Sequence, residues 1–145
     1  MAKVDLHVHS KYSNHPSEWF LQRLGAAESY TEPEAIYRMA RSRGMDYVTV
    51  TDHNCMRASL ELVAKYPEHC FTGVEATAYF PEAGSKVHVL IYGLNRDQFR
   101  VIQRLRQNIY QLRDYLRDQE LACVVAHATY SVNGRLTLDH LEKLI

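Results

Sequence analysis

Residues 47–53 read Tyr-Val-Thr-Val-Thr-Asp-His, an aromatic and β-branched run that ends in two polar side chains. Such residues favour extended structure, so we expect a buried strand over residues 47–51. Before it, residues 31–34 read Thr-Glu-Pro-Glu, which is typical of a helix start, and the helix is expected to end at Gly44. After it, residues 57–66 show the apolar spacing of another helix. A strand between two helices indicates an α/β fold.

The same alternation of strands and helices extends over the rest of the chain. Further strands are expected over residues 3–9, 71–74, 86–92 and 121–126, with a single long helix over 96–119 and a last helix from about residue 137. The intervening residues 10–31 are expected to form a long loop. This order predicts a largely parallel sheet in a barrel, or a piece of one, formed by a single domain of residues 1–145.

The composition is that of an ordinary globular domain, with 46% hydrophobic and 23% charged residues. Basic and acidic residues number 17 each, so no net charge attracts nucleic acid or a membrane surface. No apolar run approaches the roughly 18 residues of a membrane span, and the first residues enter a strand pattern rather than a secretory signal. The cysteines, at 55, 70 and 123, show neither a zinc nor a disulfide pattern. We therefore expect a cytoplasmic protein.

Four of the expected strands end in side chains that commonly bind metals. These side chains are His7 with His9, then His53, Glu75 and His127. In barrels of parallel strands, catalytic side chains lie at the carboxyl ends of the strands, so we expect these residues around one cavity. His7 and His9 are two apart on a strand and point to the same side, where Asp5 can orient one of the rings. A carboxylate such as Glu75 at the end of an apolar strand is costly unless it is paired, and it can bridge two ions.

Two further histidines are candidates with a structural alternative. His88 lies inside a strand, where a hydrogen-bonded core histidine is the competing interpretation, and His15 lies in a loop, where an exposed ring is the default. Histidine with carboxylate suits Zn, Mn or Fe. Clustered ions of this kind activate water for hydrolysis of a phosphate ester, so no catalytic residue is expected apart from the metal ligands. Basic side chains with the reach to contact such a phosphate are Lys11, Arg41 and Lys86.

The motifs together resemble the PHP family, the polymerase and histidinol phosphatase domain. In chain order they are Asp5-x-His7-x-His9, Thr51-Asp52-His53, Gly73-Val74-Glu75, Val87-His88 and Ala126-His127, and they cover nearly the whole chain. Residues 13–19 and 126–130 are also similar to the PHP region of bacterial proteins joined to glycosyltransferase modules. The resemblance implies a distorted barrel of seven strands, of which about five are expected here, and a trinuclear metal site.

The resemblance also assigns ligands to the three expected metals. His7 and His9 would hold one metal, which Glu75 would bridge to a second metal bound by His88 and His127. His53 would belong to a third site. In the family, the first and third sites each have a further ligand. These two metals would therefore each lack a ligand here.

Two positions depart from the family pattern around those further ligands. The family places an Asp or His in the loop after the first strand, which makes His15 the candidate there. A late Asp-x-His pair is expected after His127 and is not found in this sequence. We therefore expect a truncated domain. Its open sheet edge would favour self-association or the binding of a missing C-terminal domain.

Three functions remain open from the sequence. The leading one is a metal-dependent phosphoesterase that binds two or three divalent ions (Zn, Mn or Fe) and acts on a small-molecule phosphate ester. The second is a non-catalytic metal-binding or regulatory module of a larger enzyme, which the missing ligands favour. The third is a metal-dependent amidohydrolase, which also begins with His-x-His but uses a bridging Lys or a lone late Asp where this chain has Glu75.

Overall fold

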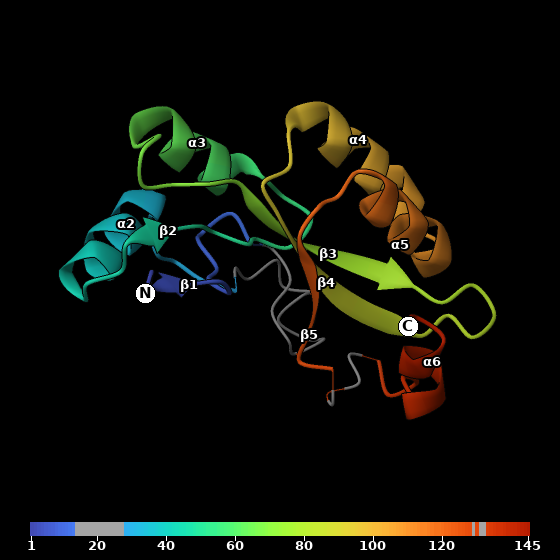
Figure 1. Cartoon of the computed structure of the whole chain (residues 1–145). Coiled ribbons are helices and arrows are strands. Elements are labelled where there is room, and N and C mark those ends of the chain that lie inside the picture. Colours follow the sequence, from blue (N-terminus) through green and yellow to red (C-terminus); the bar gives the residue numbers. More distant parts are fainter. Residues whose placement is uncertain (14–27, 129, 131–132) are drawn as a thin grey trace. The chain divides into compact units, whose positions relative to one another are not determined.

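The computed structural model of the chain describes residues 1–13, 28–128, 130 and 133–145, which form helices and strands (Figure 1). In chain order the elements are β1 (Val4–Asp5), α2 (Pro33–Ser42), β2 (Tyr47–Val48), α3 (Arg57–Lys65), β3 (Gly73–Tyr79), β4 (Lys86–Tyr92), α4 (Arg96–Leu105), α5 (Ile109–Asp118), β5 (Cys123–Ala126) and α6 (Leu138–Glu142). The predicted α/β class is confirmed. The chain divides into two compact units, residues 1–75 and 76–145, which are described in turn.

The strands of the first unit run in parallel. β1 pairs with β2 in parallel register, and the pairing continues where the backbone N–H of Thr51 donates to the carbonyl of Val8 at 2.8 Å. β1 is nevertheless shorter than the predicted strand over residues 3–9. One reason is that the backbone N–H of Val8 donates to the side-chain Oγ1 of Thr51, at 3.1 Å, instead of a backbone carbonyl. A side chain thus replaces part of the strand ladder between His7 and His9.

The third segment of the first unit joins the same parallel arrangement. Val48 forms a parallel bridge with Cys70, and His53 forms a parallel bridge with Glu75. This pairing places His53 and Glu75 side by side, although Glu75 lies near the start of β3 and not at its carboxyl end. The expected meeting of these two candidate ligands is therefore present within residues 1–75.

Two helices cover these strands with an apolar core. The buried residues of this core are Ile36, Val48, Val50, Ala58, Leu62 and Cys70. α2 begins at Pro33 as predicted, but Glu32 and not Thr31 occupies the N-cap, and it makes no capping bond. The Glu32 carboxylate instead accepts a bond from the ammonium of Lys11, at 2.7 Å. The predicted helix end is confirmed, since Gly44 adopts a φ of +77° directly after α2.

Gly73 is required by the close packing of the first unit. A Cβ at this position would lie 2.5 Å from Oγ1 of Thr49 and 3.1 Å from the carbonyl oxygen of Val50. Only a residue without a side chain allows this approach at the start of β3, two residues before Glu75.

The second unit holds a sheet in the order β3-β4-β5, in which β4 and β5 are antiparallel. β3 and β4 are joined by residues 80–85, a connection too short for a parallel crossover. The prediction of a largely parallel sheet is therefore wrong for this part of the chain. The described residues form a sheet of two strands and a sheet of three, and the closed barrel remains a prediction.

The single helix predicted over residues 96–119 is two helices, α4 and α5. The side chain of Asn108 caps α5 by accepting bonds from the backbone N–H groups of Tyr110, at 3.0 Å, and Gln111. The buried residues Ile102 and Ile109 lie on either side of the break, so the apolar stripe continues through it and conceals it. After these two helices, β5 pairs with β4 in the antiparallel direction.

The turn between β3 and β4 is tied to α5 and to the last residues of the second unit. The carboxylate of Glu82 accepts a bond from the hydroxyl of Tyr110 in α5, at 2.6 Å, and from the ammonium of Lys143, at 3.2 Å. The Tyr110 bond is the main reason that the pKa of Glu82 falls to about 2. No helix in the part of the chain that the structure describes is long and apolar enough to cross a membrane.

Candidate metal centre

Glu75 is the buried carboxylate at the centre of the candidate site. It lies inside β3 rather than at the strand tip where the sequence placed it, and its side chain is 0% exposed. Its backbone N–H donates to the carbonyl of Asp52 at 3.2 Å, and its carbonyl accepts from the N–H of Asn54 at 2.9 Å. A fully buried carboxylate is unfavourable unless cations or donors surround it. The backbone therefore fixes the position of a buried carboxylate, and neighbouring groups must compensate for the cost of its burial.

Two imidazole nitrogens meet this carboxylate. Oε2 of Glu75 lies 2.9 Å from Nε2 of His7 and 3.0 Å from Nε2 of His9, and the two nitrogens are 3.1 Å apart. Three ligands at right angles around one ion, with bonds of about 2.1 Å, would be separated by about 3.0 Å. The triangle of atoms therefore fits a single divalent ion, and its nitrogen and oxygen donors suit Zn, Mn or Fe.

A second group of donor atoms contains a residue that the sequence did not indicate. Oε2 of Glu28 lies 3.4 Å from Nδ1 of His9 and 3.5 Å from Nε2 of His53. The His9 and His53 rings are stacked, with centroids 4.9 Å apart. Burial raises the pKa of Glu28, but hydrogen bonds from His53 and Ser13 and the charge of His9 outweigh it, so the pKa lies below its usual range. Glu28 follows no expected strand and no helical stripe, so no sequence pattern marks it.

Asp52 fixes the backbone beside these ligands. It is 1% exposed, and its carboxylate accepts two bonds of 2.6 Å from Ser10, one from the backbone N–H and one from the hydroxyl. Burial raises the pKa of Asp52 despite these bonds. Asp52 thereby ties the residue after His9 to the residue before His53, which holds the two rings in register.

Asp5 has a different partner from the one expected. Its Oδ1 accepts a bond from the backbone N–H of His7, at 3.2 Å. It therefore holds the backbone of the His-x-His segment, whereas the sequence predicted that it would orient a ring.

The second unit brings His88 and His127 together. Their ring centroids are 5.1 Å apart, edge to face. The antiparallel register pairs His88 with Ala126, which places the next residue, His127, beside it. His127 has a φ of +33°, a left-handed conformation that turns the chain at the end of β5. The predicted metal shared by these two residues and Glu75 remains a prediction, and His15 lies outside the described residues.

The basic residues considered for phosphate binding have local structural partners. Lys11 pairs with Glu32, and the guanidinium of Arg41 donates to the carbonyls of Met45 and Asp46 at 2.7 and 2.8 Å. In the second unit the Lys86 ammonium lies 5.8 Å from the centroid of the Tyr79 ring. These contacts give Lys11, Arg41 and Lys86 structural roles that need no bound phosphate.

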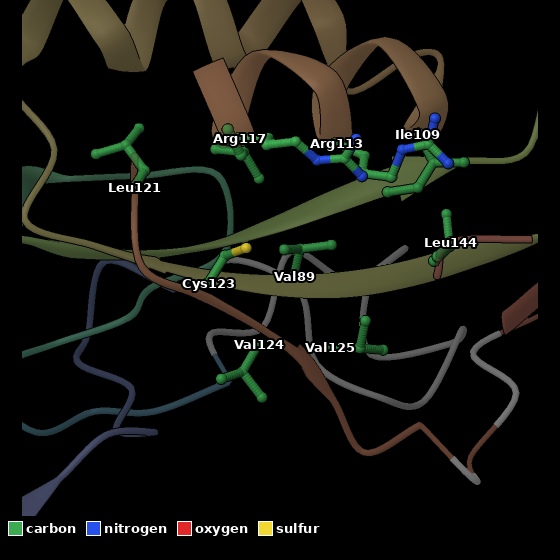
Figure 2. Close-up of a pocket in the computed structure, with 10 residues that line it drawn as sticks. Val89, Ile109, Arg113, Arg117, Leu121, Cys123, Val124, Val125 and Leu144 are labelled. Carbon is green, nitrogen blue, oxygen red and sulfur yellow. The ribbon is translucent and has the colours of Figure 1, made fainter. Parts of the chain in front are cut away.

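The second unit also contains an apolar cavity of about 250 Å³ (Figure 2). Its walls include Val89, Leu116 and Val125, with Arg113 and Arg117 as the charged side chains. None of the expected metal ligands lines it.

Comparison with known sequences gives a partial match. No family model matches the chain. An uncharacterised protein of Methanocaldococcus jannaschii, MJ1587, is 39% identical over 59 residues, which are 41% of this chain and 33% of that protein. The matched segment thus spans about a third of the length of this relative.

Two solved structures share the fold of the chain. A protein of Bifidobacterium adolescentis assigned as a metal-dependent phosphoesterase superposes with a TM-score of 0.58, at 15% identity, over 99% of this chain and 73% of that one. An amidohydrolase of Chromobacterium violaceum, solved with bound sulfate and no metal, superposes with a TM-score of 0.50, at 20% identity, over 73% of this chain and 34% of that one. The chain therefore has a fold that occurs in hydrolases, and its first unit carries a histidine and glutamate group with the spacing of metal ligands.

Proposed function

We propose that this chain supplies the metal centre of a PHP-type phosphoesterase that hydrolyses a small-molecule phosphate ester. The observation that carries the proposal is the triangle of His7, His9 and Glu75, whose three donor atoms lie 2.9 to 3.1 Å apart around a fully buried carboxylate. The fold shared with a protein assigned as a metal-dependent phosphoesterase supports it.

The residues present fit two or three divalent ions. His7, His9 and Glu75 would hold one, His53 would serve another, and His88 with His127 would serve a third. When bound, such ions supply the activation of water and the neutralisation of charge on phosphoryl oxygens. Zn, Mn and Fe suit this mixture of imidazole and carboxylate.

The protein itself contributes position and charge. Glu75 keeps its carboxylate inside the fold, where electrostatic interactions are stronger than in water. Asp52 and Ser10 fix the segments that carry His9 and His53. The His7 side chain retains 34% exposure, so the donor group is reached by solvent on that side. These features hold and orient the metal ligands. No reactive group of the protein is proposed apart from those ligands.

One observation favours a second candidate, an amidohydrolase. The Chromobacterium violaceum structure that shares the fold is an amidohydrolase. Both candidates need the same triangle of ligands, and they differ in the bond that is cleaved. The phosphoesterase is preferred because Glu75 occupies a place where an amidohydrolase would use a bridging Lys or a lone late Asp.

The test compares two substrates and three variants of the full chain. With Mn²⁺ or Zn²⁺ added, we expect hydrolysis of p-nitrophenyl phosphate and none of p-nitroacetanilide. Glu75→Gln and His7→Ala should each lower kcat/KM by at least about 100-fold, since loss of a ligand exceeds the 10–100-fold effect of its outer partners. Glu68→Gln, an exposed change outside the site, is the matched control and should leave kcat/KM unchanged.

Other outcomes identify the alternatives. Hydrolysis of the anilide alone would assign the amidohydrolase function. Stoichiometric metal binding with turnover of neither substrate would support a non-catalytic metal-binding module. Activity that survives in Glu75→Gln would exclude the triangle as the catalytic centre.

A further inference from the structure

Ser13 is a buried hydroxyl at the junction of the two donor groups in the first unit. It is 0% exposed. Its Oγ donates to Oε2 of Glu28 at 2.6 Å, accepts the backbone N–H of His53 at 3.2 Å, and lies 3.2 Å from Nδ1 of His9. Three polar partners thus surround one oxygen atom that carries one proton.

The proton count around Ser13 determines the direction of each bond. An ionised carboxylate only accepts, so the single hydroxyl proton of Ser13 points to Glu28, and 2.6 Å is the length of a charge-assisted bond. The two remaining positions on the serine oxygen are acceptors. One receives the backbone N–H of His53, and the other receives a proton from His9. With Ser13 oriented in this way, Nδ1 of His9 meets an acceptor, which favours Nδ1 as the protonated nitrogen of the neutral ring.

The other nitrogen of His9 is then free of hydrogen in the neutral ring. A neutral imidazole carries one proton, and the bond made by one nitrogen determines the state of the other. Nε2 of His9 lies 3.0 Å from Oε2 of Glu75 and 3.1 Å from Nε2 of His7. A lone pair directed at a carboxylate is repelled unless a cation lies between them. This is the arrangement that a metal ligand requires.

We propose that Ser13 and Glu28 act as positioning residues that hold His9 as the Nδ1–H tautomer and so present its Nε2 to the metal ion. The inference rests on the proposed metal centre. It assigns to Glu28 and Ser13 the orienting role that the sequence had suggested for Asp5. It also explains why a carboxylate from a distant segment lies beside a ligand that already has one acidic partner.

The first measurement is the tautomer of His9 in ¹⁵N-labelled full chain. Long-range ¹H–¹⁵N spectra distinguish the two ring nitrogens, and they are recorded with Zn²⁺ and, at alkaline pH where the ring is neutral, without metal. We expect the proton on Nδ1 in both states. In Ser13→Ala the metal-free ring should become a mixture of tautomers. A predominant Nε2–H form in the wild type would overturn the proposal, whether or not the chain binds zinc.

The second measurement is the Zn²⁺ affinity of a graded series of variants. Glu28→Gln keeps an acceptor for the serine proton, whereas Glu28→Ala leaves that proton free to point at His9. We expect a loss of roughly 10–100-fold in Ser13→Ala and Glu28→Ala, and a smaller loss in Glu28→Gln. Glu32→Gln removes an exposed carboxylate that pairs with Lys11, and it should bind zinc like the wild type.

The outcomes separate this inference from the metal centre itself. Equal losses in Glu28→Gln and Glu28→Ala, with one fewer ion bound and no change in Ser13→Ala, would make Glu28 a direct ligand and overturn the proposal. Absence of zinc binding by the wild type would refute the metal centre, while the metal-free spectrum would still decide the tautomer. Thermal unfolding shows whether each variant is folded. If Ser13→Ala does not fold, Glu28→Gln, which retains Ser13, still tests the proposal.

Discussion

Both ring nitrogens of His9 have partners within the first unit. Nε2 lies 3.0 Å from the Glu75 carboxylate, and Nδ1 lies 3.2 Å from Oγ of Ser13. Burial lowers the pKa of His9, but the hydrogen bond to Glu75 and the charges of Glu28 and Asp52 raise it more, so the pKa lies above its usual 6.5. The metal-free ring therefore binds a proton at a pH where an ordinary histidine has lost it.

Metal affinity and metal-free stability should respond to pH in opposite directions. A proton on His9 competes with a metal, so Zn²⁺ affinity should fall as the pH drops, beginning above pH 6.5. A raised folded pKa makes the contribution of His9 to metal-free stability complete below pH 6.5, and this contribution is lost as the pH rises through the folded value. Calorimetric titration and urea unfolding between pH 6 and 8.5 measure the two effects.

The matched variants for this pH series are His9→Gln and His69→Gln. The first should flatten both pH dependences, and the second, which changes a histidine outside the donor groups, should preserve them. Zinc affinity that does not vary with pH in the wild type would contradict the expected competition.

The sequence indicated some residues of this site and missed others for a physical reason. His7, His9, His53 and Glu75 follow short apolar runs, and parallel pairing brings the ends of such runs together whatever the loops do. Ser13 and Glu28 lie outside the helices and strands, and no periodicity records which side chains such segments bring together. Residues at the ends of apolar runs are therefore predictable from a single sequence, and contacts between loop residues are not.

At the level of elements, Gly73 should be irreplaceable at the start of β3. A Cβ there would lie 2.5 Å from Oγ1 of Thr49, and the backbone of Val50 prevents retreat. Gly73→Ala should destabilise the chain by about 1–3 kcal/mol, as overpacking of a tight core does. Thr49→Ala removes the clashing atom, so the double variant should lose less than the sum of the two single losses, as measured by urea unfolding. Additive losses would show that the contact does not determine the choice of glycine.

The elements of the second unit show why the remaining fold was not predictable. The stripe of Ile102, Ile109, Leu112 and Leu116 has the period of one continuous helix, yet Asn108 ends that helix and caps another. Asparagine is tolerated inside helices and favoured at caps, so its presence does not distinguish one continuous helix from two helices. The direction of β5 is set by pairing with β4, a contact between distant segments that periodicity does not record.

At the scale of the molecule, the donor group of the first unit joins segments that are far apart in the chain. Segments 7–9 and 52–53 and residue 75 meet only when residues 1–75 are folded. An ion that binds this group binds the folded form alone and should stabilise it. At a free metal concentration of 100 times Kd, the gain is about 2.7 kcal/mol, or roughly 8 °C in the unfolding midpoint.

Chelation tests that stabilisation on the full chain. Addition of EDTA to metal-loaded protein should lower the midpoint by this amount, and His7→Ala should show no response to either metal or EDTA. The second unit offers an internal reference, since Asn108→Ala should cost about 1 kcal/mol with or without metal through loss of the α5 cap. A midpoint unaffected by metal in the wild type would argue against a bound ion in residues 1–75.

The turn at residues 80–85 gives the two units contrasting sensitivities to acid. Tyr110 and Lys143 keep Glu82 ionised down to about pH 2, so the hydrogen bond and the ion pair that they form with it persist in mild acid. Within residues 1–75, by contrast, the pKa of His9 lies above its usual 6.5, so His9 gains a proton as the pH falls toward that value. A compartment that turns weakly acidic would thus protonate His9 while the contacts of Glu82 stay in place.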